Sequence, residues 1–138
     1  ALISDTVGFI NKLPAYMIEA FKSTLEELLY ADTILVLIDA NDELYQLEKK
    51  FKNCFRILSE IGVEPNKMIF VLNKSESLSD DKILSKANYL KFNENKKWVA
   101  ISAITGKNIN KLEKLINEYF QNNILENKND VSMNAYGN

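Results

Sequence analysis

The chain has 138 residues, of which 46% are hydrophobic and 26% charged, and its formal net charge is −2. This length and composition are typical of one globular domain with a buried core, and the weak negative charge argues against broad electrostatic binding to nucleic acid. The absence of histidine excludes imidazole catalysis and histidine metal ligands, and the single cysteine, Cys54, cannot form an intrachain disulfide.

No apolar stretch approaches membrane-spanning length, and the first residues do not resemble a secretory signal. Together with the unpaired cysteine, this favours a cytoplasmic protein. The chain starts at Ala1 without an initiator methionine, so we expect it to be truncated.

Apolar runs of strand length alternate with amphipathic helical stripes along the whole sequence. In chain order, we expect the end of a strand at 2–3, a helix over 14–29, a strand over 33–38, a helix over 44–61, a strand over 68–72, a helix over 79–92, a strand over 98–101 and a helix over 109–120. Pro14 suits a helix start, Ser79 a helix N-cap and Gly62 a helix end. The mostly polar residues 121–138 are expected to fray or to be disordered.

This alternation predicts an α/β fold. Repeated βα units imply a mainly parallel sheet, here of about four strands, with helices on both faces in three layers. Ligands of such sheets bind beyond the carboxyl ends of the strands. Asp5, Asp39, Asn73 and Ser102 fall at or just after these ends, so we expect them to lie along one rim.

Two loops on this rim have the side chains needed to recognise a guanine base. After one strand come Asn73, Lys74 and Glu76, and after the next come Ser102 and Ala103. A carboxylate at Glu76 can accept parallel hydrogen bonds from the guanine N1–H and 2-amino group, which adenine cannot offer. We expect Asn73 to tie neighbouring loops and reach the base, the Lys74 stem to cover one base face, and the Ala103 N–H to meet O6.

A third string, Asp5-Thr6-Val7-Gly8, follows the first expected strand. There Asp5 can hold a water on Mg²⁺, and the Gly8 N–H can sense a γ-phosphate, because glycine lets the backbone come close and change conformation. The alternative is a turn capped by the aspartate.

The patterns around two other candidate residues indicate structural roles, and the phosphate-binding loop typical of nucleotide sites is absent from the sequence. Gly106 favours a positive-φ turn over a phosphate contact, and Asp39 favours a turn or cap over catalysis. The sequence contains no G-x-x-x-x-G-K-[ST] loop, whose backbone N–H groups and lysine would hold the phosphates. We therefore assign no catalytic residue in this chain.

The residues quoted above also carry a family resemblance. The run Asp5-Thr6-Val7-Gly8-Phe9-Ile10, then Leu13-Pro14, then 20–27 (AFKSTLEE) and Ala31-Asp32 closely resemble the switch II region and following helix of HflX, a GTPase of the Obg–HflX group in the P-loop class. The resemblance continues through 34–39, 73–76 and 102–109 and covers about residues 1–120. It implies a partial GTPase domain at 1–120 that lacks the phosphate loop and switch I, followed by a tail at 121–138.

The resemblance further implies a parent protein that hydrolyses GTP with Mg²⁺, binds the large ribosomal subunit and helps separate stalled ribosomes under stress. Asp5 would be the ligand of a Mg²⁺-bound water and Gly8 the switch that senses the γ-phosphate, with Thr6 and Val7 also at the nucleotide. The guanine set would be Asn73, Lys74, Glu76, Ser102 and Ala103. The sequence departs from the family at Glu76, where the family has aspartate, so that the carboxylate is moved by about 1 Å. Phe9 cannot orient a water as the glutamine of many small GTPases does.

Two further expectations follow. The isolated chain should bind GTP or GDP weakly or not at all, because most phosphate contacts lie upstream. Without the upstream strand, 34–38 would form an apolar sheet edge, and the chain should pair with another copy or rearrange residues 1–12 over it. The alternative function is a nucleotide-independent module that docks a protein or RNA.

Overall fold

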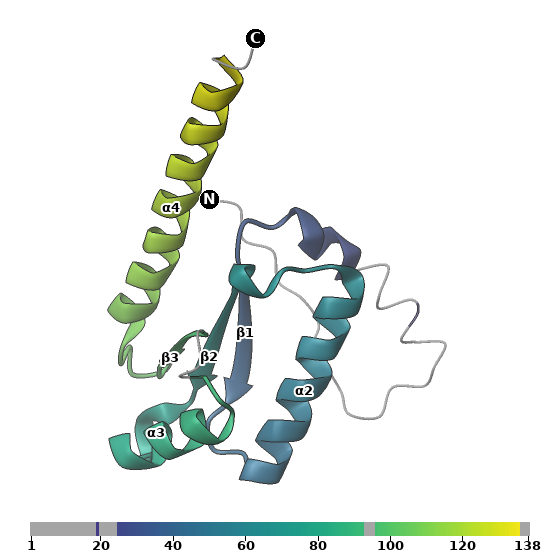
Figure 1. Cartoon of the computed structure of the whole chain (residues 1–138). Helices are drawn as coiled ribbons and strands as arrows, with labels where there is room; N and C mark the ends of the chain where they lie inside the picture. The colour runs from purple at the N-terminus through teal and green to yellow at the C-terminus, as the bar shows by residue number, and fades with distance from the viewer. Residues whose placement is uncertain (1–18, 20–24, 93–95, 136–138) are drawn as a thin grey trace.

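The computed structural model describes residue 19, residues 25–92 and residues 96–135. The expected strand at 2–3, the string Asp5 to Gly8 and most of the expected helix over 14–29 lie outside these residues. The described part has the α/β architecture that the sequence predicts (Figure 1).

The centre of the fold is a parallel sheet of three described strands. They are β1 (Ile34–Asp39), β2 (Met68–Asn73) and β3 (Lys97–Ala100), in the order β1-β2-β3. The register pairs Asp39 with Asn73 at the carboxyl ends of β1 and β2. All three strands were predicted; a fourth would fall outside the described residues.

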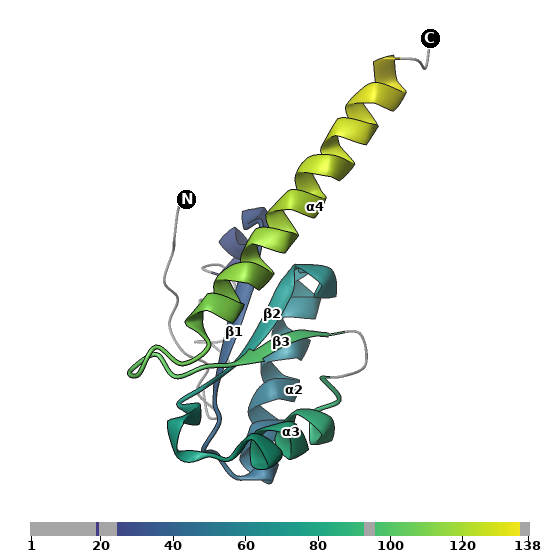
Figure 2. The same cartoon turned by 90° about the vertical axis from the view of Figure 1, so that its left-hand side faces the viewer.

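Helices and short 3-10 turns connect and cover these strands. The helices are α2 (Leu44–Ile61), α3 (Asp80–Tyr89) and α4 (Ile109–Ala135), and the 3-10 turns are η1 (Glu26–Tyr30), η2 (Pro65–Lys67) and η3 (Ser75–Ser77). The α2 and α4 helices lie on opposite faces of the sheet, so the three layers are confirmed (Figures 1 and 2).

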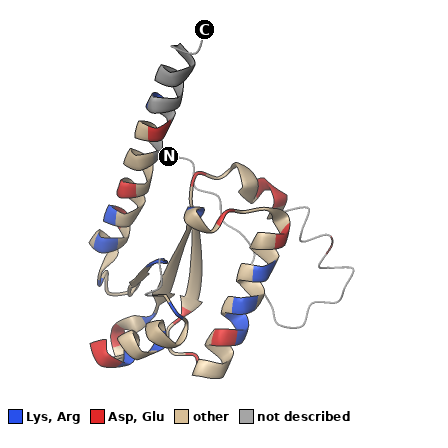
Figure 3. Ribbon diagram, in the orientation of Figure 1, with Lys and Arg blue, Asp and Glu red and all other residues tan. Residues whose placement is uncertain are grey.

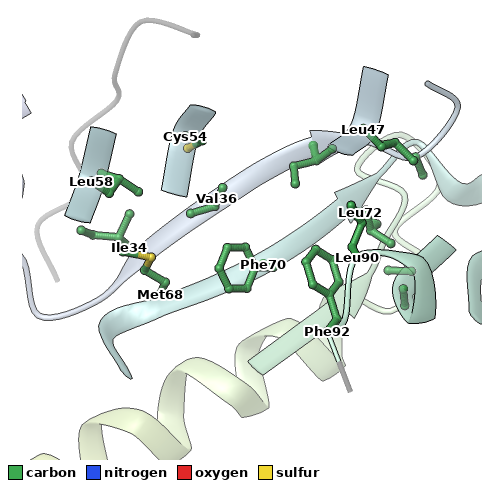
Figure 4. Close-up of a cluster of buried hydrophobic side chains, with 14 of the residues drawn as sticks. Ile34, Val36, Leu47, Cys54, Leu58, Met68, Phe70, Leu72, Leu90 and Phe92 are labelled. Carbon is green, nitrogen blue, oxygen red and sulfur yellow. The ribbon is translucent and has the colours of Figure 1, made fainter. Parts of the chain in front are cut away.

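One face of the sheet packs on α2 and α3 and forms the larger core (Figure 4). Alternate residues of β1 and β2 supply it, because successive strand side chains point to opposite faces. Phe70 of β2 stacks on Phe92 with ring centroids 5.1 Å apart, and Phe51 of α2 meets Phe92 edge-on at 5.4 Å. Trp98 of β3 lies 6.1 Å from Phe92, so this one ring joins α2, β2 and β3.

The opposite face is covered by α4 over β2 and β3 only. Ile69, Val71, Val99 and Ile101 pack there against the first turns of α4. Leu35 and Leu37 of β1 share this face, since they pair with Ile69 and Val71, yet their side chains are 37% and 60% exposed. Among the described residues, this face of β1 therefore has no complete apolar cover.

The predicted helix signals at α2 and α3 are confirmed. Gly62 ends α2 in the left-handed region with φ 104°, and its N–H bonds to the carbonyls of Leu58 and Ser59. A residue with a Cβ is strained at such a φ, which is why glycine occupies this position. Ser79 caps α3 by accepting a hydrogen bond from the Lys82 N–H at 3.3 Å.

The structure corrects three predicted helix boundaries. Residues Glu26–Tyr30 form a 3-10 turn rather than the last turn of an α-helix. The α3 helix ends at Tyr89, because Leu90 and Phe92 leave the helix to enter the core. The α4 helix continues to Ala135, through a segment expected to fray, and projects well beyond the sheet (Figure 2).

Charged residues lie mainly on the helices, and on α2 the basic residues lie between acidic residues near its two ends (Figure 3). Two i,i+4 ion pairs lie on α2, between Lys52 and Glu48 at 2.6 Å and between Arg56 and Glu60 at 3.0 Å. Within the described residues, no helix combines the length and the apolarity that a bilayer crossing needs.

The aromatic contacts of Phe92 yield a stability prediction. We expect Phe92→Ala to lower the free energy of unfolding by about 3–5 kcal/mol, because the ring is fully buried and its loss leaves a cavity between α2 and the sheet. Urea unfolding of the chain, followed by the fluorescence of its single tryptophan, Trp98, measures this change. Leu84→Ala on α3 is the control, since Leu84 is 49% exposed; equal losses in both variants would contradict the packing described.

Candidate nucleotide-binding site

The loops that leave the three strands join at one rim of the sheet, as the sequence predicts. Backbone hydrogen bonds connect them in sequence order across the rim. The Ala40 N–H donates to the Asn73 carbonyl at 2.8 Å, and the Ser75 N–H donates to the Ile101 carbonyl at 3.1 Å. The loops after β1, β2 and β3 therefore form one continuous surface.

Asn73 is the side chain that ties this surface together. Its Oδ1 accepts hydrogen bonds from the Lys74 N–H at 2.8 Å and from the Ala103 N–H at 3.1 Å. The predicted tying role of Asn73 is thus present in the structure. The Ala103 N–H, which we expected to meet the guanine O6, is held here by Asn73, while the Asn73 Nδ2 has no hydrogen-bond acceptor recorded among the described residues.

Lys74 takes an unusual backbone conformation at the start of η3. Its φ of 63° and ψ of 37° lie in the left-handed region, which a residue with a Cβ avoids by roughly 1–2 kcal/mol. Its ammonium lies 3.1 Å from the Asp39 Oδ2. The lysine stem therefore runs across the rim from β2 toward the end of β1.

The Glu76 carboxylate faces the loop after β3. A hydrogen bond from its own backbone N–H has the largest effect on its pKa, and a second from the Ser102 hydroxyl acts in the same direction. Together they lower the pKa below the ordinary glutamate value, against the opposing effects of burial and of the Asp39 carboxylate. Glu76 is therefore ionised at neutral pH and can accept hydrogen bonds beside Ser102.

The loop after β3 is a tight turn built around Ser102. The Ser102 side chain is fully buried and accepts a hydrogen bond from the Thr105 N–H at 3.2 Å, while its carbonyl accepts from the Gly106 N–H at 2.8 Å. Gly106 has φ 80°, so its predicted role as a positive-φ turn is confirmed. Ala103 and Ile104 are left exposed at the outside of this turn.

Asp39 has the structural role that the sequence favours. Its Oδ1 accepts from the Asn41 N–H at 2.9 Å, which closes a turn after β1. Partial burial raises the pKa of Asp39, but hydrogen bonds from the Asn41 N–H and the Lys74 ammonium outweigh it, and the pKa lies below its ordinary value. The contact with Lys74 is new, because the sequence cannot show that β1 and β2 are neighbours.

Two further residues of the rim, Asn41 and Lys86, are not predicted from the sequence. The Asn41 side chain bonds to the β2 loop, and the Lys86 ammonium bonds to the Ala40 and Asp42 carbonyls. One available signal was position, because Asn41 follows a strand end as Asn73 does. The described residues hold no group of three or more side chains suited to a metal ion.

The chain is similar in sequence to proteins named GTPase HflX. The chain is 37% identical over 121 residues to GTPase HflX of Lacrimispora saccharolytica, covering 88% of the chain and 27% of that protein. It is 36% identical over 136 residues to GTPase HflX of Chlamydia pneumoniae, covering 99% of the chain and 28% of that protein. The chain thus spans little more than a quarter of the length of these curated relatives. No protein-family model matches it.

A solved structure shares the fold. The crystal structure of a GTP-binding protein from the hyperthermophilic archaeon Sulfolobus solfataricus in complex with GDP matches with a TM-score of 0.70 and 31% identity, over 83% of this chain and 39% of that one. Both the sequence similarity and the fold similarity extend over more than four-fifths of the chain. The chain belongs to the HflX family of P-loop GTPases, as a segment of the α/β domain of these proteins.

Proposed function

We propose that this chain supplies the guanine-recognition side of a GTP-binding domain whose phosphate-binding side lies upstream in a longer protein. The observation that carries the proposal is the joined rim, in which an ionised Glu76 lies against Ser102 and Asn73 bridges the loops after β2 and β3. The GDP complex of the similar Sulfolobus protein supports it.

Each rim residue has a definite role in this proposal. The Glu76 carboxylate accepts from the guanine N1–H and 2-amino group, and Ser102 holds it in place. The Asn73 Nδ2 donates to the purine, and the Lys74 stem covers one base face. When the base binds, the Ala103 N–H exchanges the Asn73 oxygen for the guanine O6, so one hydrogen bond replaces another at little net cost.

The phosphate side of the proposal rests on the resemblance. Asp5, Thr6, Val7 and Gly8, outside the described residues, would contact the γ-phosphate, and Asp5 would hold Mg²⁺ through water. Mg²⁺, when bound, neutralises charge on the phosphates. In the parent protein, water attacks the γ-phosphorus and the bond to the bridging β–γ oxygen breaks, with no catalytic group from this chain.

The wider role is also inferred from the family. We propose that the parent protein is a cytoplasmic GTPase that binds the large ribosomal subunit and helps to separate stalled ribosomes. One observation favours the alternative, a nucleotide-independent docking module: the Ala103 N–H and the Lys74 ammonium already have partners within the chain. A domain whose loops are satisfied without nucleotide can keep its shape without one.

Nucleotide titration separates these two functions. In the full-length protein, we expect Glu76→Ala and Asn73→Ala to weaken GDP binding by about 10- to 100-fold, because each removes hydrogen bonds to the base. Fluorescent GDP, titrated with and without Mg²⁺, measures the dissociation constants. Asn110→Ala, on the exposed side of α4, is the control. Full-length protein that binds no GDP would favour the docking module.

The same titration tests the isolated chain. We expect its dissociation constant for GDP to exceed about 1 µM by a wide margin, since the base contacts alone do not supply the affinity given by phosphate contacts. Tight GDP binding by the isolated chain would show that the upstream phosphate contacts are not needed for affinity. It would contradict the proposal that the base contacts and the phosphate contacts lie in different parts of the longer protein.

We further propose that the isolated chain self-associates through the uncovered face and edge of β1. Leu35 and Leu37 are exposed there, and β1 is an edge strand in the part of the sheet that the structure describes. Sedimentation of the isolated chain should show dimers or larger species, and Leu37→Lys should shift it toward the monomer because a charge resists burial at the interface. Leu84→Lys on α3 is the control. A monomeric wild-type chain at high concentration would refute this proposal.

A further inference from the structure

The side chain of Asn41 spans the loop after β2 from one end to the other. Its Nδ2 donates to the Lys74 carbonyl at 2.9 Å, and its Oδ1 accepts from the Ser77 hydroxyl at 2.8 Å. Glu76 lies between these two attachment points. One side chain from the loop after β1 therefore holds both ends of the segment that carries the carboxylate.

The segment needs this support at Lys74. The left-handed conformation of Lys74 is unfavourable for a residue with a side chain, so the peptide groups on both sides must be held. Asn73 holds the Lys74 N–H through its Oδ1, at 2.8 Å. Asn41 holds the Lys74 carbonyl, and without it the peptide group between Lys74 and Ser75 keeps only the bond from the Ser75 N–H to the Ile101 carbonyl. The peptide group can then tilt about that one bond and shift Glu76 relative to Ser102.

Asn41 is itself held firmly from the side of α3. Its backbone N–H donates to the Asp39 Oδ1 at 2.9 Å. The carbonyls before and after it, those of Ala40 and Asp42, both accept hydrogen bonds from the Lys86 ammonium, the latter at 3.0 Å. A short loop with this many bonds presents the Asn41 amide in one orientation.

The two contacts require an amide at this position. The Lys74 carbonyl can only accept, so the atom facing it must donate, and the other end of the side chain must accept from Ser77. Aspartate has the same shape but offers only acceptors when ionised. It would keep the bond to Ser77 and place a negative charge against the Lys74 carbonyl.

We propose that Asn41 is a positioning residue for guanine discrimination: it fixes the Lys74–Ser77 segment so that the Glu76 carboxylate faces the 2-amino edge of the base before the nucleotide arrives. The inference rests on the proposed guanine site. It adds a residue of the loop after β1, to which the proposed site assigns no contact with the base, to the residues that set specificity.

Comparison of GDP with inosine diphosphate tests this role, because the inosine base lacks only the 2-amino group. In the full-length protein, wild type should prefer GDP, and Asn41→Asp should reduce that preference by about 10-fold or more. Loss of fold alone would weaken the binding of both nucleotides equally and leave the ratio of their dissociation constants unchanged. Asn66→Asp, at the opposite end of β2, should leave both affinities unchanged.

Each outcome of the comparison is decisive. If Glu76→Ala abolishes the preference for GDP but Asn41→Asp retains it, the positioning role is overturned and the proposed guanine site stands. A wild type without any preference for GDP would overturn both. Should Asn41→Asp fail to fold, Ser77→Ala decides, since it removes only one hydroxyl; we expect a smaller drop in preference, and an unchanged ratio overturns the proposal.

Discussion

The structure depends on the complete burial of β2 between two neighbours. Met68 to Leu72 are all buried, their side chains face two different cores, and their backbone groups pair with β1 on one side and β3 on the other. A strand of this kind can end only where polar groups find partners, because an unpaired buried backbone group is costly. Asn73 stands at that end, and its side chain supplies the partner for two backbone N–H groups.

The rim follows from this arrangement. Because β2 is central, the loops of both neighbours reach its end, and hydrogen bonds that begin at Asn73 and Lys74 extend to the loops after β1 and β3. Lys74 can remain in its left-handed conformation since its N–H, carbonyl and ammonium are all bonded. The rim is therefore a surface of loops that hydrogen bonds join to one another and that rests on an apolar sheet.

The two faces of the sheet are not equally complete. The face toward α2 and α3 is closed by a dense aromatic and aliphatic cluster, whereas α4 covers only β2 and β3 on the other face. Exposed Leu35 and Leu37 on β1 are the side chains that a further element of a larger domain would cover. This asymmetry agrees with a chain that spans little more than a quarter of its HflX relatives.

The sequence by itself determined the strands, most of the helices and the loops that follow the strands, because short-range interactions specify these features. Continuous apolar runs predicted the three described strands, and the stripe from Leu47 to Leu58 predicted α2. Gly62 and Ser79 predicted the ends of helices, because these signals act within a few residues. The loops with Asn73, Glu76 and Ser102 were also found, since each directly follows a strand.

Tertiary structure decided the rest. The exit of Phe92 from α3 reflects its place among Phe51, Phe70 and Trp98. The bonds from Asn41 to Lys74 and Ser77 join residues 33 and 36 positions apart. No local pattern encodes such a pair: it exists only because β1 and β2 lie side by side, with their carboxyl ends in register.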